Sequence, residues 1–369
     1  MISEFNENLA KLAVNYAVEV KKGQRVVVQG PSIAEDLFQA LYAEILKAGG
    51  HPLLIPDIEG TEEMLYKYGS EEQLLYVDEV KKIIIRDFDC LINIYGDYNR
   101  KKLSLVDPKK IAQSKSSPGR LELFKTYMER DSKGEFNWVV IPYPCNSMAQ
   151  EAGMDLFSYS DFVKKALILD KEDPVKEWKD IEKKQDVIVE YLNNVEKIQV
   201  LGEDTDLSLS VKGRKWINCC GHKNLPDGEV FTAPLEDSVN GHIRFTYPGI
   251  FQGKEIENIY LEFKNGKVTK ATADKAEDLL QELIAIKNAD ILGEFAIGTN
   301  YGITDFTKNM LFDEKIGGTL HSALGMGPPE TGSTNQCAIH WDILKDMRLP
   351  GSKIIADRKV IYEEGHWKN

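Results

Sequence analysis

The sequence is poor in cysteine and lacks the segments that mark secreted or membrane proteins. Its five cysteines are an odd number without CxxC spacing, so neither a disulfide framework nor a cysteine zinc site is expected. No run approaches the ~20 apolar residues that a membrane span needs. The N-terminal MISEFNENLAKLAV has no basic leader followed by an apolar run, so no signal peptide is predicted. These absences predict a cytoplasmic protein with reduced thiols and no membrane partner.

Positive charge is also scarce. The formal net charge is −13, which repels polyanions, and the lysine clusters lie in stretches of mixed charge that are typical of solvated helix faces. Nucleic acid is therefore not an expected partner. A chain of 369 residues exceeds what one hydrophobic core usually sustains, so two domains are expected.

Residues 1–172 are predicted to form an N-terminal α/β sandwich domain with parallel strands. An apolar stripe from Leu9 to Val20 predicts a first helix. The apolar run RVVVQG, a helical pattern over 34–47 and the run PLLIP then give a β-α-β order, which implies parallel strands. DCLINIYG and NWVVIPYP predict two more strands. The loop QGPSIAED lacks the glycine motifs of nucleotide sites, so an ordinary strand-to-helix turn is expected there.

Residues 173–369 are predicted to form a strand-rich α+β domain. A charged helix over about 170–195 would bridge the two domains. Side chains then alternate over 200–211, 256–263 and 267–272, and Asn265-Gly266 between the last two runs predicts a hairpin. A helical pattern follows over 273–287.

Three stretches of this second half place metal-ligand side chains in strands or turns. Glu229 follows a Pro-Asp-Gly turn in LPDGEVFTAP, Glu294 lies in GEFAIG, and His321 precedes an Ala-Leu-Gly turn. In AIHWDIL, His340 and Asp342 are two residues apart and would share one face of a strand. Imidazole and carboxylate side chains converging in this way suit a divalent metal ion.

The residues alone leave ordinary structural roles open. An isolated His321 is more often a hydrogen-bonded structural histidine than a ligand, Glu229 alone is a common turn carboxylate, and an HxD pattern recurs by chance. The observation that favours a metal is that three of only six histidines lie with these acids in one domain, beside glycine turns.

Longer motifs resemble those of a known family. LPDGEVFTAP, GEFAIG, LFDEK followed by HSALG, and PETGSTNQCAIHWD resemble the thermophilic metallo-aminopeptidase family of dimetal exopeptidases, and KKGQRVVVQGP near the N-terminus is similar as well. The resemblance implies a homodimeric aminopeptidase that acts on small peptides and binds two divalent ions, zinc, cobalt or manganese. It implies these ligands: Glu229, Glu294, His321, His340 and Asp342.

The implied mechanism uses a water shared by the two ions to attack the peptide carbonyl. Glu294 would bridge the ions, and either Glu229 or Glu294 would act as the general base. Neighbouring acids would orient the ligands; the candidates are Asp227, Asp313 and Glu314.

The sequence departs from the family at one position. Family members carry a tyrosine, credited with a catalytic role, seven residues after the first histidine, where this chain has Pro328. Tyr247, Tyr301 and Arg244 are the candidate substitutes. Two alternative hypotheses for the function stay open. The chain is a catalytically impaired relative that binds peptide or metal, or it is a mononuclear non-haem iron dioxygenase that cleaves rings.

Overall fold

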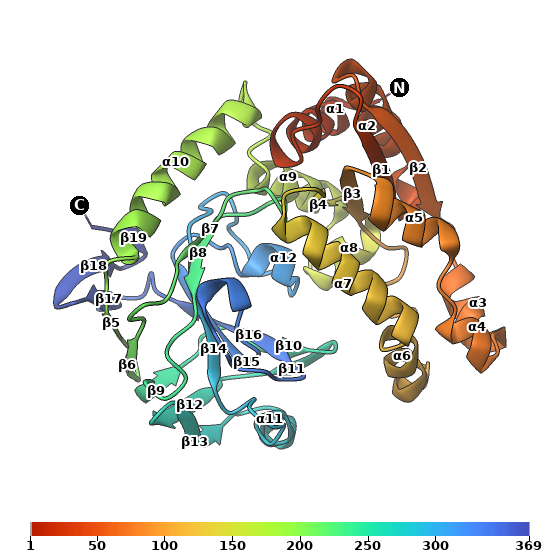
Figure 1. The fold of residues 1–369 in the computed structure, drawn as a ribbon. Helices are drawn as coiled ribbons and strands as arrows, with labels where there is room; N and C mark the ends of the chain where they lie inside the picture. Colours follow the sequence, from red (N-terminus) through yellow and green to blue (C-terminus); the bar gives the residue numbers. More distant parts are fainter. Residues whose placement is uncertain (1, 369) are drawn as a thin grey trace. The chain divides into compact units, whose positions relative to one another are not determined.

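The computed structural model describes residues 2–368, which form two compact units (Figure 1). The N-terminal unit contains residues 1–176 together with 221–225. The C-terminal unit contains residues 177–220 and 226–369. Each unit is described by itself.

The N-terminal unit is built on a four-stranded sheet with the order β2-β1-β3-β4, in which all neighbours are parallel. Helix α2 (Glu35–Lys47) connects β1 to β2 and buries the apolar side of its helical pattern. The predicted β-α-β order and both later strands are thereby confirmed. The strands are β1 (Arg25–Pro31), β2 (His51–Asp57), β3 (Cys90–Tyr95) and β4 (Asn137–Pro142).

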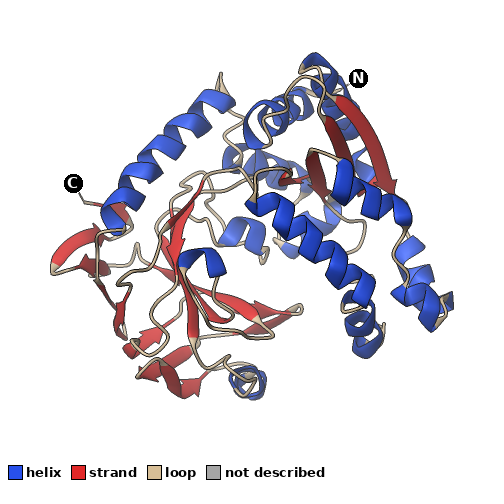
Figure 2. Ribbon diagram, viewed as in Figure 1, coloured by secondary structure: helices blue, strands red, loops and turns tan. Residues whose placement is uncertain are grey.

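Helices surround this sheet (Figure 2). The predicted first helix is present, but α1 (Glu4–Leu12) gives way to a π-helical turn over Ala13–Ala17, which periodicity over the whole stretch did not indicate. The other helices are η2 (Ser32–Ala34), α3 (Thr61–Tyr68), α4 (Glu71–Leu75), α5 (Glu79–Asp87), α6 (Pro108–Lys115), α7 (Pro118–Ser132), α8 (Asn146–Glu151) and α9 (Leu156–Ala166).

A short segment from later in the chain completes the N-terminal unit. Residues 221–225 run along β4, where Val140 N donates to Lys223 O at 2.8 Å and Leu225 N donates to Val140 O at 2.9 Å. The sheet therefore continues past its last named strand through a backbone that belongs to the second half of the sequence.

The C-terminal unit contains two larger sheets that are antiparallel throughout. The eight-stranded sheet has the order β13-β12-β9-β6-β5-β17-β18-β19 and the five-stranded sheet has the order β16-β15-β14-β8-β7. The first consists of β5 (Lys197–Gly202), β6 (Thr205–Ser210), β9 (Asn240–Arg244), β12 (Tyr260–Lys264), β13 (Lys267–Thr272), β17 (Lys353–Ala356), β18 (Lys359–Glu363) and β19 (His366–Trp367).

The five-stranded sheet consists of β7 (Ile217–Cys219), β8 (Glu229–Thr232), β14 (Leu292–Gly298), β15 (Thr319–Gly325) and β16 (His340–Asp346). Smaller elements of this unit are β10 (Gly249–Phe251), β11 (Lys254–Ile256), α11 (Glu277–Ile284), α12 (Met310–Asp313) and η3 (Pro329–Thr331). Helix α10 (Pro174–Leu192) begins in the N-terminal unit and continues into this one.

One hydrophobic core joins the two larger sheets. Val200 and Ile243 of the eight-stranded sheet belong to the same buried cluster as Phe295, Leu320 and Ile343 of the five-stranded sheet. One face of the five-stranded sheet therefore packs in this hydrophobic core. Polar side chains can occupy the other face.

Short sequence patterns in this unit differ in how well they predicted its strands and turns. The Asn265-Gly266 turn is confirmed, since both residues have positive φ and join the antiparallel β12 and β13. The alternation over 200–211 does not mark one strand, because the chain turns at Asp204 (φ 46°) and pairs β5 with β6. No helix in the described part of the chain is both long and apolar enough to cross a bilayer.

Candidate metal centre

The five-stranded sheet brings the five predicted ligands together from four adjacent strands. Glu229 begins β8, Glu294 lies in β14, His321 in β15, and both His340 and Asp342 in β16. Because β16, β15, β14 and β8 are consecutive neighbours in the sheet, residues far apart in the sequence meet on one surface.

The register of the strands places small side chains between the ligand-type ones. Ala296 lies opposite His321, and Ala323 lies opposite both Glu294 and Asp342 in the two neighbouring strands. A methyl group occupies little of the surface that a larger side chain would cover. The face therefore leaves space between imidazoles and carboxylates, which is where an ion would need to sit.

The other face of the same strands is apolar and buried. Trp341 and Ile343 alternate with His340 and Asp342 along β16 and belong to the hydrophobic core, where they are 3% and 0% exposed. Ile339, next to the strand, is partly buried against the same core. The prediction that His340 and Asp342 share one face of this segment while Ile339, Trp341 and Ile343 pack on the other is confirmed.

Glu294 lies at the middle of the cluster. Its Oε1 is 3.3 Å from His321 Nε2, and its Oε2 is 3.5 Å from His340 Nε2. The second oxygen of Glu229 is also 3.3 Å from His321 Nε2, and Asp342 Oδ1 is 3.4 Å from His340 Nε2. Each imidazole therefore faces two carboxylates.

The acids dominate the electrostatics of the cluster. Burial alone would lower the pKa of both histidines, but Glu294 and Glu229 raise the pKa of His321 to about 9, and Asp342 and Glu294 raise that of His340 to about 10. Burial would likewise raise the pKa of Asp342, but the charge of His340 lowers it to about 2. The negative charge of the buried acids thus favours a positive charge beside them.

Several buried polar atoms of this face fit a metal ion. Among the described residues, Glu229 Oε2, Asp342 Oδ1 and His321 Nδ1 are buried without a hydrogen-bond partner. Two ligand sets have donor atoms within 4.8 Å of one another: Glu229, Glu314 and His321, and Glu294, His321 and Asp342. Carboxylate oxygens with imidazole nitrogens are a donor set that suits divalent zinc, cobalt or manganese. The residues present therefore fit divalent metal.

The structure adds a lysine that the sequence analysis did not single out. The side chain of Lys315 is 1% exposed, and its Nζ lies 3.3 Å from Glu229 Oε1 and donates to Glu314 Oε2. The motif LFDEK contained this residue, but no pattern in it distinguished a buried lysine from a solvated one. Burial raises the pKa of Glu314 to about 8 despite the charge of Lys315, and Glu314 lies in one group with Glu229 and His321.

The other two predicted orienting acids differ from each other. Asp227 lies within a group formed with Cys219 and Glu229, where burial and then the charge of Asp227 raise the pKa of the Cys219 thiol well above its ordinary value. Asp313 is fully buried and accepts hydrogen bonds from Thr307 N, Thr307 Oγ1 and Asn309 N. Through these hydrogen bonds Asp313 holds the loop that contains Thr307 and Asn309.

Pro328 lies on the loop beside His340. Thr331 N donates to Pro328 O at 3.1 Å, and His340 Nδ1 lies 2.7 Å from Met326 O, two residues before the proline. The hydrogen bond that His340 Nδ1 donates to the Met326 backbone carbonyl orients the ring so that Nε2 faces Glu294 and Asp342.

The three candidate substitutes for the family tyrosine have other partners. Tyr301 donates its hydroxyl to Gly365 O, Arg244 forms an ion pair with Asp204, and the Tyr247 hydroxyl accepts from an arginine.

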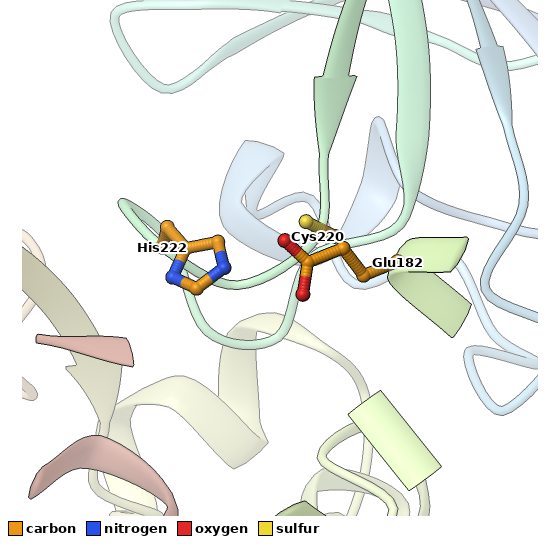
Figure 3. A group of neighbouring side chains, drawn as sticks. All are labelled: Glu182, Cys220 and His222. Carbon is orange, nitrogen blue, oxygen red and sulfur yellow. The ribbon is translucent and has the colours of Figure 1, made fainter. Parts of the chain in front are cut away.

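Two other features share no residue with this cluster. Figure 3 labels three side chains of ligand-forming types, Glu182, Cys220 and His222. Because His222 belongs to the N-terminal unit and the other two do not, no site is assigned to this group. A cavity of about 1100 Å³ lies in the N-terminal unit, at the ends of β1, β2 and β3, and shares no residue with the ligand face.

The cluster is one that could hold divalent metal, and comparison with known proteins identifies the chain as a metal-dependent hydrolase of peptide bonds. The family described as thermophilic metalloprotease (M29) matches residues 3–367, so this chain belongs to that family. The resemblance found in the sequence is thereby confirmed, and so is the class of enzyme.

Named relatives span nearly the whole chain. It is 26% identical to aminopeptidase AmpS of Bacillus subtilis, with 97% of each chain covered, and 26% identical to aminopeptidase T of Thermus thermophilus, with 98% of each covered. Its structure superposes on that of wild-type AmpT from Thermus thermophilus with a TM-score of 0.85 over the full length of both chains, at 21% identity. The predicted fold class is confirmed.

Proposed function

We propose that this chain is a metal-dependent aminopeptidase, with residues 173–369 as its catalytic, metal-binding domain. The observation that carries the proposal is the shared face of four neighbouring strands that gathers five ligand-type side chains around two alanines. Membership of a metalloprotease family supports peptide hydrolysis, and relatives named aminopeptidases support removal of N-terminal residues.

The ligands that we propose are those predicted from the sequence: Glu229, Glu294, His321, His340 and Asp342. When bound, divalent ions would acidify water and polarise the scissile carbonyl of the peptide. Glu294 has both oxygens facing imidazoles, so it can serve as the shared ligand. Glu229 or Glu294 would accept the proton of the attacking water, since each is a buried carboxylate aimed into the cluster.

We further infer two ions per chain, of zinc, cobalt or manganese. Three carboxylates and two imidazoles exceed the three protein ligands of a mononuclear catalytic site, which supports a dimetal centre over the iron dioxygenase alternative. Small peptides as substrates and a homodimer remain part of this proposal, supported by the resemblance of the sequence to the family. A cytoplasmic location also remains part of it, supported by the cysteine usage of the sequence.

Metal analysis combined with a panel of aminoacyl and N-acetylated aminoacyl fluorogenic substrates tests the proposal. We expect close to two divalent ions per chain, cleavage of substrates with a free amino group, and loss of cleavage when a strong chelator removes the metal. Full activity in a demonstrably metal-free sample would overturn the mechanism. One ferrous ion with oxygen consumption would favour the dioxygenase, and two ions without turnover would favour an impaired relative.

A further inference from the structure

Lys315 is a buried ammonium in direct contact with one proposed ligand. Its side chain is 1% exposed, and its Nζ lies 3.3 Å from Glu229 Oε1 while also bonding Glu314 Oε2. Removing an ammonium group from water is costly unless carboxylates surround it closely. A lysine in this position is therefore held by its acids and does not sample solvent.

The backbone fixes the position of this lysine. Gly298 lies directly opposite Glu229 in the sheet, and a Cβ at Gly298 would come within 2.2 Å of the Ile316 carbonyl oxygen. Because glycine has no side chain, residues 315 and 316 can lie against β14 beside Glu229. Asn300 N then donates to Lys315 O at 3.0 Å, which anchors the segment.

The two oxygens of Glu229 consequently have different surroundings. Oε1 faces Lys315, whereas Oε2 faces His321 Nε2 at 3.3 Å and has no hydrogen-bond partner. Glu294 contrasts with it, because both of its oxygens face imidazoles. Only Oε2 of Glu229 faces an imidazole of the proposed ligand set.

We propose that Lys315 is a positioning residue that restricts Glu229 to binding metal through a single oxygen. The inference rests on the proposed function and extends it to a residue outside the ligand set. A catalytic metal site differs from a structural one in keeping a coordination position open. If Glu229 bound through both oxygens, it would fill a position that the enzyme needs for its reactants.

The direction in which metal affinity changes when Lys315 is removed distinguishes a positioning role from a structural one. Lys315 carries a positive charge, so removing it lowers the repulsion of a divalent cation and also frees Glu229 Oε1 to bind. Metal affinity should then be unchanged or higher while turnover falls. A lysine that merely stabilised the acidic cluster would lower metal affinity and turnover together when removed.

The test compares Lys315→Met with wild type by metal affinity, from competition with a chelator, and by kcat and KM. We expect kcat to fall about ten- to hundredfold, the range seen when partners of metal ligands are lost. KM should change little, metal affinity should not fall, and Lys315→Arg should restore part of kcat. Lys345→Met is the matched control, since Lys345 is equally buried but donates to the Arg244 carbonyl at 3.0 Å.

A Lys315→Met enzyme with wild-type kcat would overturn the proposal, as would a joint loss of metal affinity and kcat that arginine does not restore. If the methionine variant does not fold, Lys315→Gln keeps a donor without the charge and is held to the same two measurements. Should wild type and the Lys345 control both fail to cleave peptides, the proposed function falls, but the comparison of metal affinities still decides the role of Lys315.

Discussion

Glu294 Oε1 lies 3.3 Å from the Nε2 atom of His321. The other oxygen of the same carboxylate faces His340 at 3.5 Å, so Glu294 is the acid placed between both imidazoles. Its strand contacts β8 on one side and β15 on the other, which puts it at the centre of the ligand face.

A shared ligand should matter to more than one ion. We expect Glu294→Gln to reduce metal content below one ion per chain and to abolish peptide cleavage, because an amide supplies one neutral oxygen where the carboxylate supplied two charged ones. Elemental analysis of the purified variant measures this directly. Glu262→Gln, on the eight-stranded sheet and outside the cluster, is the control and should keep full metal content. Retention of two ions by the Glu294 variant would contradict the central role of this acid.

His340 offers a test of the ligand face against the packing face. We expect His340→Ala to lose metal and activity but to keep a cooperative thermal transition, because the core contacts of β16 come from Trp341 and Ile343 on the opposite face. Circular dichroism and metal analysis of the same sample provide the measurement, with His242→Ala in β9 as control. If the variant unfolds while its folded fraction retains metal, His340 is a structural residue.

Pro328 marks the position where the family resemblance places a catalytic tyrosine. Loss of one donor to an oxyanion costs about 2.7–4 kcal/mol of transition-state stabilisation, a slowing of roughly a hundred- to a thousandfold. We expect wild type to be a slow peptidase and Pro328→Tyr to raise kcat with little change in KM. Pro328→Phe supplies the ring without the hydroxyl and should give no rise, which controls for the freer loop. Brisk cleavage by wild type and a lower kcat in the tyrosine variant would show that another donor acts here.

Asp346 at the end of β16 gives a prediction about acid stability. Burial alone would raise its pKa, but hydrogen bonds from Arg348 N, Nε and Nη2, each 2.8 Å long, hold the pKa below its ordinary value. A lowered folded pKa stabilises the fold above the unfolded value of about 3.9 and loses that effect as the pH falls through the folded value.

Asp346→Asn should therefore lower the free energy of unfolding by about 1.5 kcal/mol at pH 7, the lower range for a hydrogen bond to a charged group. The difference from wild type should begin to shrink below about pH 3.9, where the unfolded chain takes up a proton, and should vanish only below the lower folded pKa of Asp346. Urea unfolding of chelator-treated protein at several pH values measures both. A difference that stays constant with pH would mean that the substitution acts through shape and not through charge.

Sequence periodicity was sufficient for elements whose signals are local. The strands around β1 and β2 were recognisable because short apolar runs alternate with a helical pattern, and Asn265-Gly266 supplies positive φ where a two-residue hairpin needs it. The break at Asp204 was not recognisable, since an alternating pattern continues through a tight turn with the same side-chain period.

The candidate site shows the same limit. Spacing alone placed His340 and Asp342 on one face, but the meeting of Glu229 with His321 depends on long-range strand order that no local pattern encodes. Lys315 could not be identified for a related reason. Its burial follows from Gly298, seventeen residues earlier, which lets the two backbones approach.

The course of the chain between its two units has a consequence for dividing the protein. The polypeptide passes from one unit to the other three times, at residues 176–177, 220–221 and 225–226, so no single cut separates them. A gene fragment ending at residue 176 would leave the Val140 amide and carbonyl of β4 without the partners that Lys223 and Leu225 provide. That fragment would present an open strand edge, the kind of surface on which chains associate with one another. When the two halves are expressed as separate proteins, the fragment that ends at residue 176 is therefore expected to aggregate.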